Sequence, residues 1–142
     1  MKISNFIWKI LNYYLPTFHN LHIRGISNGD LCPMYNEEEE SLTHFFLLCP
    51  FSRAYWHGTT LAIRTSNFTN LFVQLWLKRI ISRHDLRDLD SKSYMQDVFI
   101  TLWAIWTYRN KVVHQGIIPN PMKVILIAQN FSCRYKASLS NS

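Results

Sequence analysis

The stretch YMQDVFITLWAIWTYRNKVVHQG, residues 94–116, constrains the fold more than any other part of this sequence. Its middle, from Val98 to Trp106, is apolar on nearly every side. A helix with this pattern is usually buried between other helices. The apolar run is much shorter than the roughly 20 residues that a membrane span needs. We therefore predict a helical protein in which other segments cover this helix.

Further helices are predicted from apolar spacing and from proline and glycine at their ends. The expected ranges are residues 4–14, 17–25, 41–49, 50–58, 67–82 and 121–138. The polar segment 83–93 is expected to be a solvated loop. Four glycines in 142 residues argue against a turn-rich β-sandwich or barrel. The predicted fold class is mainly α, a small helical domain with a short zinc-knuckle-like loop or hairpin near residues 28–50.

Three cysteines, an odd number, do not make a disulfide framework, so we expect a reducing compartment, the nucleus or the cytoplasm. Cys133 is expected to be a free thiol, at least partly buried. The apolar N-terminal stretch is interrupted by Lys9 and Asn12 and lacks a small-residue cleavage site after it, which argues against secretion.

The segment CPMYNEEEESLTHFFLLCP, residues 32–50, contains the candidate metal ligands. Cys32, His44 and Cys49 have the order of a zinc knuckle, but Tyr35 stands where a second cysteine would complete a C-x2-C pair. Three alternatives follow. The three residues hold zinc weakly, the fold is metal-free and held by its core, or another ligand takes the fourth position. The glutamate run 37–40 is interpreted as a solvated face rather than a catalytic site.

Several stretches together resemble one family. FIWKILNYYLPTFHNLHIRGI, followed by CPMYNEEEESLTHFFLLCPFSRAYW, is similar to the zinc-binding domain that follows the reverse transcriptase of plant non-LTR (LINE-type) retrotransposons. LWAIWTYRNKVVHQG resembles the linker that leads to a ribonuclease H domain in such elements. The resemblance implies zinc ligation by Cys32, His44 and Cys49. We expect three parts, a zinc-knuckle-like domain at 1–60, a helical extension or linker at 61–138 and a frayed tail at 139–142.

Basic residues are concentrated in the second part of the chain. Residues 1–49 carry three basic and five acidic side chains, whereas residues 50–142 carry twelve and four. Such a surface attracts polyanions, although cations near helix C-termini also have a structural reason to be there. The residues predicted to contact phosphates are Lys78, Arg79, Arg83, Arg87, Arg109 and Lys111.

The sequence has no F/Y-x-D-D motif and no spaced set of carboxylates of the kind that holds catalytic metal ions. We therefore predict no enzymatic activity. The first functional hypothesis is a nucleic-acid-binding accessory module derived from a retrotransposon polyprotein, binding RNA or DNA without sequence preference. Its partners would be the reverse transcriptase or ribonuclease H domains of a related chain. The alternative is a degenerate fragment that acts only as a helical structural or protein-interaction module.

Overall fold

The computed structural model describes residues 2–25, 29, 31–34, 38–58, 72–83 and 89–140. Within these ranges the chain is helical and contains no strand beyond one isolated bridge. The predicted mainly α fold class is therefore confirmed. The elements are α1 (Lys2–Leu11), α2 (Phe18–Ile23), the π-helix η1 (His44–Leu48), α3 (Pro50–Gly58), α4 (Val73–Arg83), α5 (Leu89–Gln115) and α6 (Pro121–Ser140).

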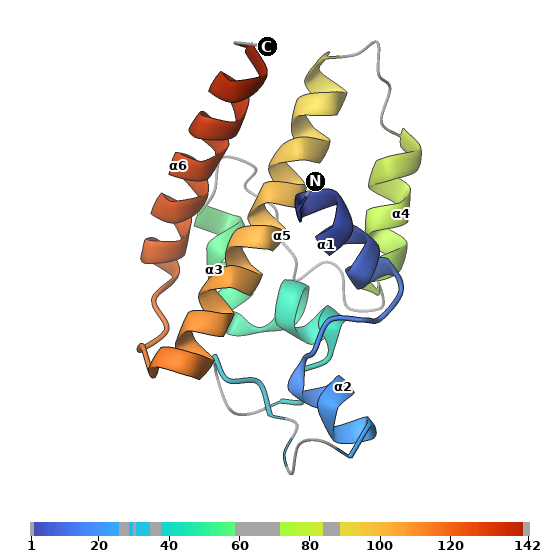
Figure 1. Cartoon of the computed structure of the whole chain (residues 1–142), viewed down its shortest axis with the longest axis vertical. Coiled ribbons are helices and arrows are strands. Elements are labelled where there is room, and N and C mark those ends of the chain that lie inside the picture. The colour runs from blue at the N-terminus through green and yellow to red at the C-terminus, as the bar shows by residue number, and fades with distance from the viewer. Residues whose placement is uncertain are drawn as a thin grey trace.

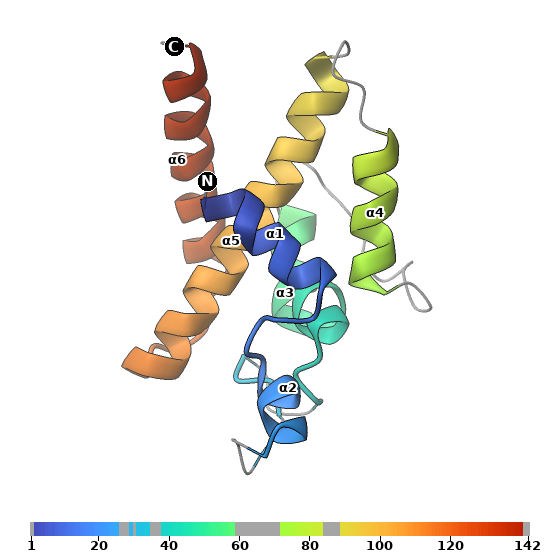
Figure 2. The same ribbon diagram turned by 45° about the vertical axis from the view of Figure 1, so that its right-hand side comes forward.

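The long helix α5 lies at the centre, as its apolar sequence predicts (Figure 1). Helix α6 packs along one side of α5 and also contacts α3, while α1 crosses α5 and reaches α4. Figure 2 shows α4 on the side of α5 opposite to α6, with α2 set apart from the helices around α5. No helix in the described part of the chain is long and apolar enough to cross a bilayer.

One cluster of buried hydrophobic side chains joins the two halves of the chain. It includes Phe6 of α1, Phe46 of η1 and Ile105 of α5, all at most 4% exposed. The rings of Phe6 and Phe46 meet edge to face with centroids 6.2 Å apart. The predicted packing of the knuckle helix onto the first helix is thus confirmed. Helices α3 and α6 also pack together. The predicted boundary at residue 60 lies outside the described residues and stays a prediction.

Helix α1 begins before Ser4 and ends at Leu11, earlier than predicted. Its end is a Schellman turn, in which the Tyr14 amide donates to the Lys9 carbonyl and the Tyr13 amide to the Ile10 carbonyl. Tyr13 occupies the left-handed region with φ of 61°, a position that usually carries glycine. Apolar spacing beyond Leu11 therefore overstated the length of this helix.

Two further boundaries differ from the prediction. Helix α5 begins at Leu89, so residues 89–93 are helical although they are mostly polar and were expected to form a loop. Helix α6 begins at Pro121 as expected but continues to Ser140, through half of the predicted tail. Polar residues at a helix end carry no apolar periodicity, and this is why the pattern did not include them.

Candidate metal centre

Backbone contacts with Glu38 and Glu39 position the segment that contains Cys32. The Cys32 amide donates a 2.7 Å hydrogen bond to the Glu38 carbonyl, and Leu31 and Glu39 form an antiparallel bridge. Ser41 then caps the next helical segment, because its Oγ accepts the His44 amide at 3.1 Å. The predicted helix start at Ser41 is present, and of the predicted loop or hairpin the described residues show this one bridge.

The π-helix η1 sets the position of His44 relative to Cys49. Pro50 disfavours a helical conformation at the residue before it, and Cys49 accordingly has ψ of 136°. The Cys49 amide donates to the His44 carbonyl at 2.7 Å, a bond that spans five residues. This single wide turn brings the side chains at both of its ends to the same place. Cys49 also accepts the first hydrogen bond of α3, from the Arg53 amide at 2.9 Å.

The wide turn leaves carbonyl groups that α3 satisfies. The Ser52 hydroxyl donates to the Phe45 carbonyl, and the Trp56 indole Nε1–H donates to the Phe46 carbonyl at 2.7 Å. Both donors are buried. A buried carbonyl without a hydrogen-bond partner lowers the stability of the folded state. These two hydrogen bonds therefore stabilise the π-turn and fix the position of α3 relative to it.

Cys32, His44 and Cys49 come together as predicted from their spacing. Their donor atoms all lie within 4.8 Å of one another, and both cysteines are fully buried. The two Sγ atoms are 3.7 Å apart, far longer than a disulfide of about 2.05 Å. Two thiolates bound tetrahedrally at about 2.3 Å from one zinc ion would be about 3.8 Å apart. The sulphur pair therefore already has the separation that zinc requires.

The two thiols share one proton unequally. The hydrogen bond from the Cys32 thiol, helped by the neighbouring His44 imidazole, lowers the pKa of Cys49 to about 5. The same hydrogen bond, together with burial, raises the pKa of Cys32 far above its usual range. The lowered pKa favours the thiolate form of Cys49, which a hydrogen bond from the Cys32 thiol would stabilise.

Cys32, His44 and Cys49 fit three of the four coordination positions of a tetrahedral zinc ion. Nε2 of His44 is buried and has no hydrogen-bond partner in the described part of the chain, as expected for a nitrogen reserved for a metal. The widest separation in the cluster would have to shorten by about 1 Å on binding. Tyr35, at the position of the fourth ligand, lies outside the described residues. His57 is exposed on α3 and is not part of the cluster.

A buried ion pair lies between this centre and α5. Glu40 accepts two hydrogen bonds from Arg109, at 2.8 Å from Nε and 2.5 Å from Nη2, and a third from the Phe18 amide at 2.6 Å. Glu40 is 0% exposed and Arg109 is 3% exposed. The guanidinium lies 4.8 Å from the centre of the Phe18 ring and 4.7 Å from that of Trp106. The pair thus ties the start of α2 and the end of the knuckle loop to α5.

Two predictions about these residues are corrected. Glu40 is not part of a solvated face, although Glu38 and Glu39 are exposed as expected. Arg109 does not belong to a phosphate-contacting surface, because it is buried and committed to Glu40. Burial raises the pKa of Glu40, and the Arg109 guanidinium opposes that rise. Leu102, Ile105 and Arg109 are separated by three and four residues and therefore share one face of α5, the face that packs into the core. This spacing indicates that Arg109 is buried, and the prediction from sequence did not use it.

The remaining predicted cations fall into separate places. Lys78, Arg79 and Arg83 are exposed on the second half of α4. Lys111 is also exposed, but it lies near the C-terminal end of α5, about 33 Å along that helix from its first residue. Arg87 lies outside the described residues. The structure therefore groups three of the six predicted residues on one helix.

Cys133 is a free thiol on α6, but it is exposed rather than partly buried. It lies in the last helix of the chain and takes no part in the cluster of Cys32, His44 and Cys49. The expectation of a buried or semi-buried side chain at this position is therefore wrong.

Comparison with known proteins agrees with the geometry of the centre. The family model described as zinc-binding in reverse transcriptase matches residues 1–56, less than half of the chain. No curated protein and no solved structure matches the chain significantly. The matched segment contains Cys32, His44 and Cys49 and ends at Trp56, whose indole supports the π-turn. Residues 1–56 are thus similar to the zinc-binding domain of reverse transcriptases.

Proposed function

We propose that this chain is a non-catalytic accessory module derived from a plant LINE-type retrotransposon polyprotein. In this proposal it binds nucleic acid without sequence preference, and Cys32, His44 and Cys49 bind zinc only weakly because the fourth ligand is missing. The observation that carries the proposal is the 3.7 Å separation of the two sulphurs inside the segment that matches the family. When bound, zinc would supply a structural cross-link between the loop, η1 and the start of α3.

The exposed cations of α4 support the nucleic-acid part of the proposal. Lys78, Arg79 and Arg83 lie within six residues on one helix that carries no carboxylate. Cations spaced in this way neutralise successive phosphates and release counterions, which makes binding strongly dependent on salt. Arg83 also ends the helix, where a cation interacts favourably with the helix dipole whether or not a ligand is present.

The test uses the whole chain and a labelled single-stranded RNA of about twelve nucleotides, with the dissociation constant measured by anisotropy at several salt concentrations. Replacing Lys78, Arg79 and Arg83 by alanine should weaken binding. Three lost contacts should also reduce the slope of log affinity against log salt by about 2. The control replaces the exposed Lys123 and Arg134 of α6 by alanine. Negligible affinity at low salt, or an unchanged slope in the α4 variant, would overturn the proposal.

A second candidate is a helical protein-interaction module, whose partner would be a reverse transcriptase or ribonuclease H domain of a related chain. Apolar side chains exposed on α6 favour it, since Met122 is 62% and Leu126 58% exposed one helical turn apart. This candidate predicts that replacing Met122 and Leu126 by serine abolishes association with such a domain. The nucleic-acid proposal predicts that the same variant binds RNA with unchanged affinity.

A further inference from the structure

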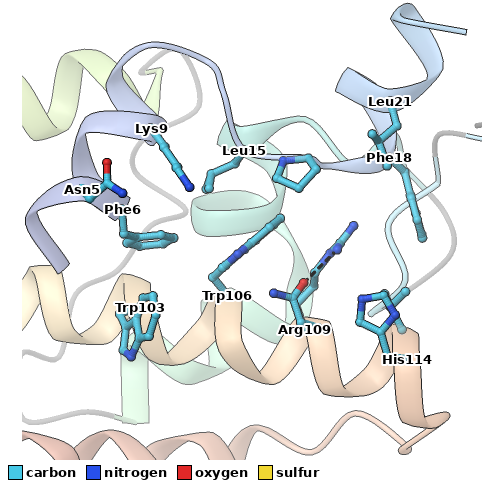
Figure 3. Close-up of a pocket in the computed structure, with 13 residues that line it drawn as sticks. Asn5, Phe6, Lys9, Leu15, Phe18, Leu21, Trp103, Trp106, Arg109 and His114 are labelled. Carbon is cyan, nitrogen blue, oxygen red and sulfur yellow. Dashed lines mark hydrogen bonds between the residues drawn. The ribbon is translucent and has the colours of Figure 1, made fainter. Parts of the chain in front are cut away.

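A cavity of about 520 Å³ lies between α1, the segment that leads into α2, and α5 (Figure 3). Its size is within the range of small-molecule sites. Four aromatic rings line it, those of Phe6, Phe18, Trp103 and Trp106. Trp103 is only partly buried, so part of its indole surface remains available to a ligand. The interior of the cavity is therefore suited to a flat, apolar ring.

Hydrogen-bond donors surround this aromatic interior. Asn5 and Lys9 lie one turn apart on α1, and Asn110 and His114 lie one turn apart on α5, so the two pairs approach from different helices. In Figure 3 Lys9 extends from α1 into the cavity. Oδ1 of Asn110 accepts a 3.0 Å hydrogen bond from Arg109, which directs the N–H groups of that amide away from Arg109. The rim can therefore donate several hydrogen bonds to one ligand.

The charge of the cavity selects for an anion. None of the described residues that line it carries a carboxylate, and Lys9, Arg109 and His114 are basic. The charge of Arg109 is balanced by Glu40, so the lysine is the uncompensated cation. Next to it in sequence, Trp8 stacks on Tyr14 with ring centroids 5.4 Å apart, and both side chains are more than half exposed. These rings offer a second aromatic surface beside the same cation.

We propose that the cavity binds one unpaired nucleotide of a single-stranded nucleic acid. The base enters the aromatic interior against Trp103, and Lys9 binds the adjoining phosphate. Asn110 and His114 donate to acceptors on the base edge or the sugar. The next base along the strand stacks on the exposed Trp8–Tyr14 pair. This inference rests on the proposed nucleic-acid function, but it names a different surface from α4 and requires bases as well as phosphates.

The test compares two ten-nucleotide single-stranded DNAs that have the same charge, one with normal bases and one with abasic sugars throughout. Stacking of one base in the cavity should make the intact strand bind at least about fivefold more tightly. Leu21→Trp places a large side chain into the cavity from α2 and should remove this preference without changing the charge. Lys9→Ala should weaken both strands more than Lys123→Ala, a matched loss of one exposed cation on α6.

The outcomes separate this inference from the proposed function. Equal affinity of the two strands for the unaltered protein would overturn the cavity site while leaving binding through α4 intact. A preference that persists in a folded Leu21→Trp variant would also overturn it, because the bases would then bind elsewhere. No binding of either strand at low salt would overturn both proposals. A preference that is present in the unaltered protein and lost in Leu21→Trp would establish the site.

Discussion

Replacing Arg109 by methionine tests whether the buried ion pair holds the knuckle against α5. The change would leave the Glu40 carboxylate fully buried and without its counter-charge, and the Phe18 amide would be its remaining hydrogen-bond partner among the described residues. Removing one member of a buried pair costs about 3–5 kcal/mol. A domain of this size has a total stability of about 5–15 kcal/mol, so the loss is a large fraction of it.

The loss should depend on pH in a defined direction. Burial already raises the pKa of Glu40, and without Arg109 the Phe18 amide and the nearby His44 remain to oppose that rise. In the Arg109→Met variant the folded state would therefore take up a proton at a pH at which the unfolded state remains ionised. Stability should then increase as pH falls from 7 toward about 4.5, by up to about 1.4 kcal/mol per pH unit. The deficit relative to the unaltered protein should shrink over the same range.

The assay is urea unfolding followed by circular dichroism at pH 7 and pH 5, with the variant compared to the unaltered protein at each pH. A deficit of 3–5 kcal/mol should lower the midpoint by about 2 M urea. The matched control is the double variant Glu40→Gln with Arg109→Met, in which the glutamine can still accept the Phe18 amide. It should recover at least half of the deficit at pH 7 and show little pH dependence. A single variant within about 1 kcal/mol of the unaltered protein, or a double variant as unstable as the single, would refute the reasoning.

Two further predictions concern the metal centre and its support. Zinc affinity should rise about tenfold per pH unit between pH 6 and 8, because the lowered pKa of Cys49 favours its thiolate and the raised pKa of Cys32 leaves one proton for zinc to displace. A competition titration with a zinc indicator measures this dependence, and a slope of zero or two protons would contradict it. Trp56→Phe should cost about 2–4 kcal/mol in urea unfolding, because it leaves the buried Phe46 carbonyl without its donor. The control Trp8→Phe, at a 52% exposed position, should change stability by less than about 0.5 kcal/mol, and equal effects would contradict the role of the Trp56 hydrogen bond.

Local signals in the sequence predict much of this fold. Pro50 and Pro121 mark the starts of α3 and α6, and Ser41 marks the start of the segment that leads into η1. The order and spacing of Cys32, His44 and Cys49 are those of a zinc knuckle, and this pattern predicts that the three side chains meet. These features depend only on residues close together in the chain.

The buried pair was not predictable in the same way. Glu40 is one of four successive glutamates, and nothing local distinguishes it from Glu39, which is exposed. Its partner Arg109 is 69 residues away, and only the packing of α5 against the knuckle loop brings them together. Local spacing also failed to indicate the π-turn, whose extra residue is stabilised by Trp56 from the following helix. Contacts between distant segments decide both features, and a single sequence does not display them.

The central claim is that Cys32, His44 and Cys49 form a zinc site that is complete but for one ligand. The most direct test is the zinc content per chain, measured after dialysis against a chelator, for the unaltered protein and for Tyr35→Cys. We predict well below one equivalent in the unaltered protein and close to one equivalent in the variant, together with a higher melting temperature. A chelator-resistant, stoichiometric ion in the unaltered protein, or equal zinc content in both, would contradict the account.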